Sequence, residues 1–304
     1  MSRLERLRDS DLWHSFTASP VTVIAAIVAI LMVLAAALAQ AIAPHDPFNP
    51  STLNLMDGFT RPGEEGAGSG ATFVLGTDNQ GRDLLSAILY GAQVSLIVGI
   101  ASVIFSVLLG VSLGLLAGYL GGRTEAVIMR IADVQLSFPA ILVALLVFGV
   151  ARGVIPPAYQ ENATLIVLVI AIGLSNWAQY ARTVRGSTLV EKSKDYVAAA
   201  RVIGLGSLPV MRKHVWPNVS GPVVVIATIN LALAIIEEAT LSFLGVGMPP
   251  TQPSLGTLIR IGQQYLFSGE WWILFFPAFT LILLALSINL LGDWLRDALD
   301  PKMR

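Results

Sequence analysis

Two adjacent carboxylates, Glu237 and Glu238, lie in a long apolar stretch of the chain that also holds Asn230. A carboxylate near the middle of a bilayer costs about 2.5–3.5 kcal/mol, so it normally faces a helix-bundle interior or a water-filled cavity. Neighbouring positions of a helix point about 100° apart, so the two glutamates cannot face one cavity equally. All three residues are candidates for a translocation path, contacting a substrate amine or controlling a gate. The alternative is a structural role, in hydrogen bonds between helices or in contact with a partner chain.

The patterns of common catalytic sites are missing from the sequence. There is no Gly-x-x-x-x-Gly-Lys-Ser/Thr loop, so the chain cannot bind ATP by that route, and the glycine run at 64–70 does not replace one. Neither His-Glu-x-x-His nor Gly-x-Ser-x-Gly occurs, and the absence of cysteine excludes thiolate chemistry. The three histidines, His14, His45 and His214, belong to different loops. We therefore expect no catalytic residue, metal or cofactor in this chain.

A helix–glycine–helix pattern occupies residues 195–217. A short helix starts at Asp195 and carries Ala199 and Ala200, Gly204 breaks it, and a second short helix is expected to end at Trp216-Pro217. This hairpin lies in the longest basic loop, where a docking surface for a soluble partner is expected. The small side chains would let a partner approach the backbone. The alternative is an ordinary loop helix with a C-terminal glycine stop.

Composition places these residues in a membrane protein. The 304-residue chain is 55% hydrophobic and 13% charged, about half the charged fraction of soluble domains. We expect an all-α, polytopic fold with six transmembrane helices of roughly 20 residues each. The expected spans are 21–43, 94–119, 134–150, 163–181, 222–244 and 273–291. The first is too long for the apolar core of a signal peptide and is interpreted as a retained anchor. The third is the shortest and contains Pro139.

The placement of Lys and Arg predicts the orientation. Fifteen of the 19 basic residues fall on one side, among them Arg3, Arg6 and Arg8 of the N-terminal tail and Lys302 and Arg304 of the C-terminal tail. We therefore expect the tails 1–20 and 294–304 to be cytoplasmic, with a cytoplasmic loop 183–220 inside a core domain 94–293. The segment 44–93 is then periplasmic, and we expect its glycine-rich part, 64–70, to be flexible.

A stripe of small residues, Gly110, Gly114 and Gly118, recurs every four positions in the second span. Such a stripe lets another helix approach closely. It serves either packing within the bundle or an interface with a partner subunit.

The basic loop resembles the EAA loop of ABC-importer permeases, in which two alanines and a glycine are followed by a proline. The matching positions are Ala199, Ala200, Gly204 and Pro217, whereas Ala198 stands where the family usually has Glu. Four further stretches, in family order and spacing, resemble dipeptide and oligopeptide permeases of the "C" type. They are 75–96, 129–139, 242–250 and 292–301, and the similarity extends over about residues 20–304.

This resemblance implies a type I ABC importer permease fold in the bacterial inner membrane. It implies a homologous second permease, two cytoplasmic ATPases that bind ATP and Mg and dock through Asp195, Ala199, Ala200, Gly204 and Pro217, and a periplasmic substrate-binding protein. Dipeptides or short oligopeptides are the expected substrates, with nickel chelates, glutathione and opines as alternatives. No nucleic acid is implied.

Two other classes of function stay open at this point. A secondary transporter or channel would work without an ATPase and would show inverted repeats or intramembrane cation sites. An integral membrane enzyme would convert its substrate into a different product. ATP dependence separates an importer subunit from the first of these classes.

Overall fold

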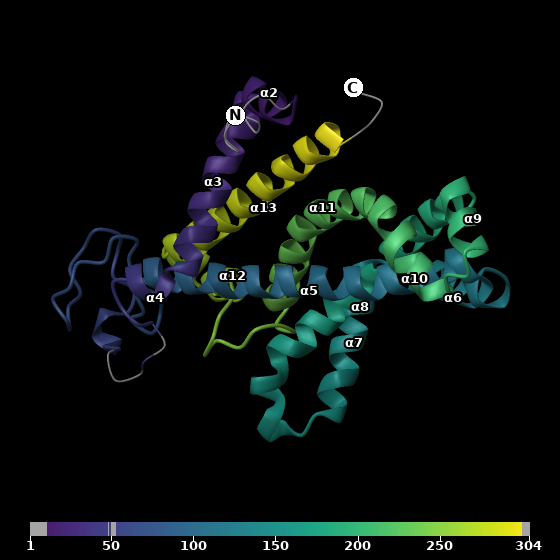
Figure 1. Cartoon of the computed structure of the whole chain (residues 1–304). Helices are drawn as coiled ribbons and strands as arrows, with labels where there is room; N and C mark the ends of the chain where they lie inside the picture. Colours follow the sequence, from purple (N-terminus) through teal and green to yellow (C-terminus); the bar gives the residue numbers. More distant parts are fainter. Residues whose placement is uncertain (1–10, 48, 50–52, 300–304) are drawn as a thin grey trace.

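The computed structural model describes residues 11–47, 49 and 53–299, and these residues form a helical bundle (Figure 1). Extended pairing within them is limited to two isolated bridges, Glu65 with Thr72 and Thr77 with Asp83. The all-α expectation is confirmed. The tail residues Arg3, Arg6, Arg8, Lys302 and Arg304, on which part of the predicted orientation rests, lie outside the described residues.

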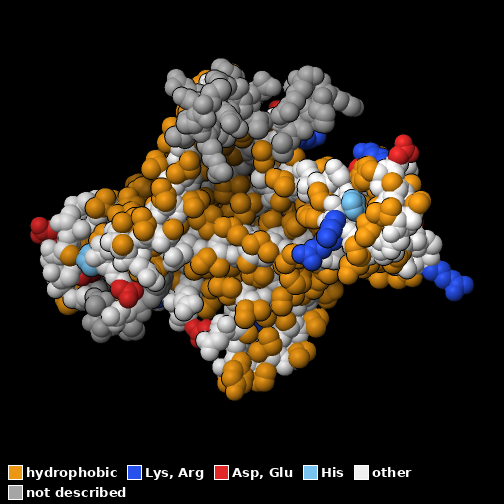
Figure 2. All heavy atoms as spheres, viewed as in Figure 1, with side chains coloured by type: hydrophobic (Ala, Val, Ile, Leu, Met, Phe, Trp, Pro, Cys, Tyr) orange, Lys and Arg blue, Asp and Glu red, His pale blue; other side chains and the backbone are white. Residues whose placement is uncertain are grey.

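Five helical segments are long and apolar enough to cross a membrane. Near the N-terminus, α2 (Asp11–Ala18) leads into the first of them, and α4 (Ala39–Ile42) follows it. The five are α3 (Pro20–Ala37), α5 (Leu84–Leu120), α8 (Pro157–Glu191), α11 (Trp216–Phe243) with the turns that precede it, and α13 (Trp272–Leu299). Helix α5 starts inside the expected periplasmic segment. Hydrophobic side chains cover most of the bundle surface, and the charged ones visible in Figure 2 lie mainly toward its two ends.

The expected third span is not one helix. Instead α6 (Gly122–Leu136) and α7 (Ala140–Val154) meet at a bend of 101°. Pro139 lies in the break, and proline both lacks an amide hydrogen and disfavours helical geometry in the residue before it. The third span, expected at 134–150, is thus broken at Pro139 and divided between the end of α6 and most of α7. Six spans are reached when the bent pair counts as one.

Helices α5 and α8 pack closely because glycines line their contact. A Cβ atom added at Gly110 would lie 2.5 Å from the Trp177 carbonyl oxygen, and one at Gly114 would lie 2.6 Å from that of Ala181. At Gly118 the nearest atom, Cβ of Thr188, would be 2.7 Å away. These separations leave no room for a side chain. The interpretation of the stripe as packing within the bundle is confirmed.

The segment between α4 and α5 folds around the buried Asp57, which ends the short helix η1 (Leu55–Asp57). The backbone amides of Gly68 and Ser69 donate to Asp57 Oδ1 at 2.6 and 3.1 Å. Burial favours a higher pKa for this carboxyl, but the hydrogen bonds from Ser69 and Gly68 outweigh it and hold the pKa below its usual value. The glycine-rich part, expected to be flexible, is therefore held in place by hydrogen bonds.

A second connection packs on the same end of the bundle. Between α11 and α13 the chain forms α12 (Leu255–Tyr265) and η3 (Leu266–Ser268), which the sequence analysis did not anticipate. The indole of Trp272 donates to the Thr77 carbonyl at 3.1 Å, and Arg82 Nη1 donates to the Pro250 carbonyl at 2.9 Å. These bonds join the two connections into one cap over this end of the bundle.

Candidate functional site

The hairpin predicted from the sequence exists, and a glycine turn shapes it. Helix α9 (Asp195–Val202) ends at Gly204, whose φ of +86° favours glycine. The amides of Gly204 and Leu205 donate to the carbonyls of Arg201 and Ala200 at 2.9 and 3.1 Å. This pair of bonds is a Schellman motif, which satisfies the last carbonyls of a helix. Gly204 therefore ends α9 as an ordinary glycine stop, and this role does not exclude a docking surface at the same turn.

The second arm of the hairpin differs from the prediction. After the turn come α10 (Ser207–Val210) and the π-helical turn η2 (Met211–Val215), and the chain runs directly into α11. Pro217 lies in the first turn of α11, directly after η2. The predicted end of a short helix at Trp216-Pro217 is therefore wrong. The second arm is continuous with the membrane-spanning helix α11.

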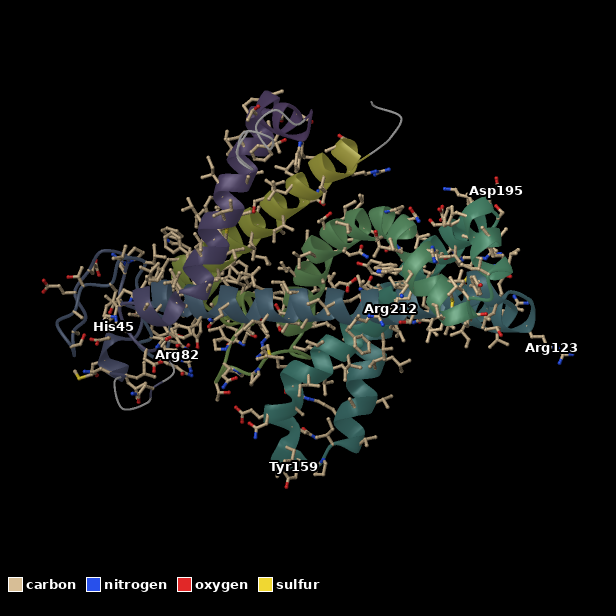
Figure 3. The ribbon with its side chains drawn as sticks, in the orientation of Figure 1. His45, Arg82, Arg123, Tyr159, Asp195 and Arg212 are labelled. Atoms are coloured by element: carbon tan, nitrogen blue, oxygen red, sulfur yellow. The ribbon has the colours of Figure 1, made fainter. Side chains whose placement is uncertain are left out.

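The residues singled out in the hairpin fall on two faces. Asp195, Ala199 and Gly204 are exposed, and nothing lies within 4 Å of a Cβ atom built at Gly204. In Figure 3 Asp195 lies at the outer tip of the molecule. Ala200 is only 4% exposed and packs with Val197 in an internal hydrophobic cluster. The expectation that Ala200 offers its small side chain to a partner is wrong, because that side chain supports α9 from beneath.

Large apolar side chains surround the exposed glycine turn. Val202, Ile203 and Leu208 are 86%, 76% and 71% exposed. They flank Gly204 on a protrusion that Figure 1 places at one end of the molecule. The sequence analysis missed them, although apolar residues beside the glycine of a basic loop were a usable signal. An apolar patch beside an open glycine is suited to close contact with another protein.

Polar contacts fix α9 to the ends of three long helices. The Tyr196 hydroxyl donates to Glu191 of α8, and Asn218 Nδ2 of α11 donates to that hydroxyl at 3.1 Å. Partial burial, with the hydrogen bond to Glu191 and its negative charge, raises the pKa of Tyr196 to about 12, so it remains a donor at neutral pH. The Arg201 guanidinium carbon lies 5.0 Å from the centre of the Tyr119 ring of α5. These contacts connect α9 directly to α5, α8 and α11.

Glu238 occupies the centre of a buried polar network. It is fully buried, Ser95 Oγ of α5 donates to its Oε2 at 2.7 Å, and Ser242 Oγ donates to its Oε1 at 2.6 Å. The Leu255 amide at the start of α12 donates to Ser95 Oγ at 3.3 Å, and the Met248 amide donates to Ser242 Oγ at 3.1 Å. Both carboxylate oxygens therefore tie α5, α11 and the α12 connection together.

Glu237 points to a different neighbour, as the helical angle predicts. Asn176 Nδ2 of α8 donates to Glu237 Oε2 at 2.9 Å, and Glu237 is half-buried. About two helical turns earlier in α11, Asn230 is 4% exposed and donates to Gln179 Oε1 at 3.2 Å. Glu237 makes no ion pair with any described residue. Of the two glutamates, Glu237 is the one whose side chain is partly accessible, and no described cation pairs with it.

The histidines do not come together where the structure places their side chains. His45 packs against Phe73, whereas His214 lies beside Tyr196 of α9, at the opposite end of the molecule (Figure 3). Over the described ranges, no group of three or more His, Asp or Glu side chains is arranged to hold a metal ion.

Comparison with known proteins assigns the class. Residues 110–304 match the family described as "Binding-protein-dependent transport system inner membrane component", and residues 10–58 match the "N-terminal TM domain of oligopeptide transport permease C". The chain belongs to the first of these families, the permeases of ABC importers. The resemblance stated from the sequence is confirmed.

Individual relatives are similar over almost the whole chain. The di/tripeptide transport system permease protein DppC of Pseudomonas aeruginosa is 37% identical over 294 residues, covering 97% of this chain and 92% of the relative. The dipeptide transport system permease protein DppC of Escherichia coli K12 is 37% identical over 297 residues, covering 97% and 93%. Among solved structures, an inward-facing MetNI methionine ABC transporter matches with a TM-score of 0.54 at 20% identity, over 70% of this chain and 96% of that one. This last likeness supports the fold alone.

Proposed function

We propose that this chain is one permease subunit of an ATP-driven importer that translocates dipeptides or short oligopeptides across the bacterial inner membrane. The names of its relatives support the substrate class, and the extent of the similarity supports the same subunit role. A homologous second permease completes the pathway, and a periplasmic binding protein delivers the substrate. Nickel chelates, glutathione or opines are alternative cargoes for the same type of importer.

The observation that carries this proposal is the exposed apolar hairpin around Gly204. Two partner ATPases, which hold ATP and Mg, dock on this surface and its copy in the second permease. Asp195 and Ala199 lie at the contact, with Val202, Ile203 and Leu208 supplying apolar area. Ala200 and Pro217 do not contact the ATPase in this proposal. Ala200 packs beneath α9, and Pro217 lies in the first turn of α11. Closure of the ATPases moves α9, and the contacts of Tyr196 and Arg201 pass this movement to the bundle.

In this proposal the two termini and the hairpin are cytoplasmic, and the segment around Asp57 is periplasmic. Glu237 and Asn230 lie along the translocation path, with Glu237 able to meet the amino group of a peptide. Glu238 is next to the path but serves it indirectly, because both of its oxygens already accept hydrogen bonds. The chain itself carries no ATPase chemistry.

The test is purification of the importer in mild detergent from cells that express Gly204→Glu, with Gly70→Glu as the matched control. Both glycines have positive φ, +86° and +67°, and neither has an atom within 4 Å of an added Cβ. The backbone strain is therefore similar, and only the location differs. We expect Gly204→Glu to lose co-purifying ATPases and ATP-dependent uptake, and Gly70→Glu to retain the ATPases.

Equal recovery of ATPases and equal uptake with both variants would refute docking at this hairpin. Uptake by the reconstituted wild-type chain without ATP would move the assignment to a secondary transporter. Uptake of a nickel chelate in preference to dipeptides would retain the importer and change its cargo.

A further inference from the structure

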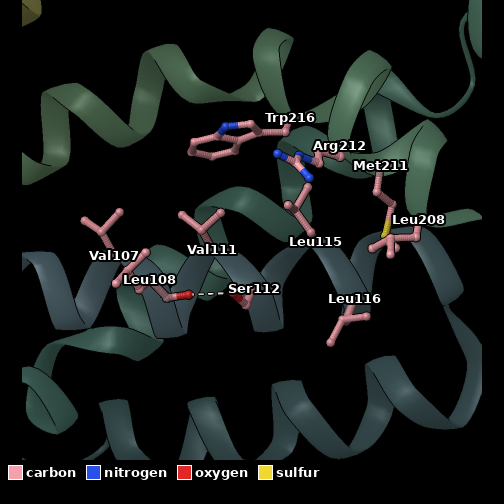
Figure 4. A pocket seen from close by; sticks show the side chains of 10 residues that line it. All are labelled: Val107, Leu108, Val111, Ser112, Leu115, Leu116, Leu208, Met211, Arg212 and Trp216. Carbon is pink, nitrogen blue, oxygen red and sulfur yellow. Dashed lines mark hydrogen bonds between the residues drawn. The ribbon is translucent and has the colours of Figure 1, made fainter.

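A groove runs along α5 beside the hairpin and leads to its second arm (Figure 4). Its volume is about 460 Å³, within the usual range of small-molecule sites. One wall is the face of α5 from Val107 to Leu116, and the other is formed by Leu208, Met211, Arg212 and Trp216. Leu108 is 64% exposed there, although it is a large apolar side chain. The α5 wall of the groove is therefore apolar and accessible.

Arg212 is the one charged side chain that lines this groove. It makes no ion pair with any described residue, whereas Arg182 and Arg185 of α8 pair with Asp133 and Glu125. Figure 4 places its guanidinium inside the groove, between Trp216 and Leu115. Arg212 is exposed and has no carboxylate partner among the described residues, so its guanidinium is available to pair with an anionic group of a molecule in this apolar groove.

The dimensions of the apolar wall fit one leaflet of a bilayer. From Val107 to Leu116 the helix rises about 14 Å at about 1.5 Å per residue. Half of a hydrocarbon core of about 30 Å is close to this length. Arg212 and Trp216 lie opposite this wall, and both residue types are enriched at the level of lipid headgroups. The groove therefore accommodates an acyl chain along α5 with a headgroup near Arg212.

We propose that this groove binds an anionic phospholipid, with one acyl chain along Val107–Leu116 and the phosphate paired with Arg212. A phospholipid supplies the apolar chain and the anion together. A helix from another subunit would have to place a carboxylate at this level to satisfy the same guanidinium. Basic sites between transmembrane helices on the cytoplasmic side bind anionic headgroups by this chemistry. The bound lipid contacts η2 and the start of α11, so it braces the arm through which the hairpin meets the bundle.

Lipid binding in this groove goes beyond the proposed transport function and does not depend on which substrate the importer carries. The test is native mass spectrometry of the purified importer during titration with phosphatidylglycerol, and separately with phosphatidylcholine of the same acyl chains. We expect the wild type to prefer phosphatidylglycerol and Arg212→Gln to bind it about fivefold more weakly, as for the loss of one basic contact. Arg123→Gln is the control, because Arg123 is also exposed and basic but lies off the groove (Figure 3).

A second pair of variants tests the groove rather than the charge. Ser112→Trp fills it from α5, and the Ser112 hydroxyl that is lost contacts only the Leu108 carbonyl of its own helix. Ile104→Trp is the control, since Ile104 is 54% exposed on α5 and does not line the groove. We expect Ser112→Trp alone to lose bound lipid of both kinds.

Three outcomes would overturn the proposal. Equal binding of phosphatidylglycerol by Arg212→Gln and wild type would remove the role of the guanidinium. Equal binding of both lipids by wild type would remove the anion requirement. Binding of glycerol phosphate with unchanged affinity in Ser112→Trp would reveal a site for a free phosphate, without an acyl chain.

Discussion

At the scale of single residues, the buried carboxylate of Glu238 joins α5 to α11 by accepting hydrogen bonds from Ser95 and Ser242. Changing Glu238 to Ala would leave the hydroxyls of Ser95 and Ser242 without their acceptor. An unsatisfied buried donor costs about 1–3 kcal/mol, so we expect a loss of about 2–4 kcal/mol in stability. Glu238→Gln retains an acceptor oxygen and should lose about half as much. Thermal unfolding of the detergent-purified importer measures both variants.

A matched control for this prediction lies on the same helix. The exposed Thr240 donates only to the Ile236 carbonyl of its own helix, at 2.7 Å, so Thr240→Ala should leave the midpoint of unfolding almost unchanged. A midpoint for Glu238→Ala equal to that of Thr240→Ala would contradict the bracing role.

Glu237 leads to the opposite expectation. Its carboxylate is half-buried and holds one donor, from Asn176, so Glu237→Gln retains shape and hydrogen bonding while removing the charge. If Glu237 meets the amino group of a peptide in the path, uptake should fall about fivefold to tenfold with little change in thermal stability, as for one surface-accessible charge contact. Uptake of radiolabelled dipeptide by proteoliposomes measures this. Wild-type uptake would show that the pair with Asn176 is only structural.

The sequence predicted part of this residue-scale picture. The angle of about 100° between adjacent helical positions separates Glu237 from Glu238, and the structure confirms the separation. The hydrogen-bond donors to the two glutamates could not be predicted from the sequence, because Ser95 and Asn176 are far from them along the chain. Which of the two carboxylates is enclosed depends on how three helices pack, and local pattern does not encode this.

At the scale of helices, the contact between α5 and α8 depends on glycine. Gly114→Ala would place a Cβ atom 2.6 Å from the Ala181 carbonyl oxygen, so the helices must separate. Overpacking typically costs about 1–3 kcal/mol, which exceeds the roughly 1 kcal/mol that alanine gains over glycine within a helix. We expect a lower unfolding midpoint. Gly149→Ala in α7 has no atom within 4 Å of the new Cβ and should be neutral or slightly stabilising.

Opposite signs for these two chemically identical changes are the diagnostic result, measured by thermal unfolding of both variants in one detergent. A loss of stability in both would indicate a general cost of alanine in this bundle. No loss in either would show that α5 and α8 can separate without penalty.

Element boundaries were predictable where local chemistry sets them. Pro139 and Gly204 both interrupt helices, as their backbone preferences require, and the glycine stripe predicted a close helix contact. A span is nevertheless expected across Pro139, because the apolar run continues past it. The second arm of the hairpin is expected to end at Pro217, whereas in the structure the helix continues through this proline. Helix α12 was predictable as an amphipathic helix, because its buried residues Leu255, Leu258 and Gly262 recur at helical spacing. It is too short for a span, and the expectations above concern long apolar runs.

At the scale of the whole molecule, the two ends of the bundle differ in construction. One end carries the exposed hairpin seated on α5, α8 and α11, and the other carries a cap made of the segment around Asp57 and the α12 connection. The buried Glu238 network reaches the cap, and the Tyr196 and Arg201 contacts reach the hairpin. The long helices α5 and α11 belong to both systems, so movement at one end has a direct mechanical route to the other.

The direction of this route depends on the orientation of the chain, which cysteine labelling tests cleanly because the sequence contains no cysteine. Ala67→Cys places a thiol on the segment around Asp57, and Ser193→Cys places one just before α9, both at exposed positions. The six-span topology predicted from the sequence puts 15 of the 19 basic residues on the side of the hairpin, so the positive-inside rule predicts that Ser193 is cytoplasmic. An impermeant maleimide should label Ala67→Cys in spheroplasts and Ser193→Cys only after permeabilisation, while the cysteine-free parent stays unlabelled. Labelling in the reverse order would place the hairpin outside, where no cytoplasmic ATPase could reach it, and would end the importer mechanism built on it.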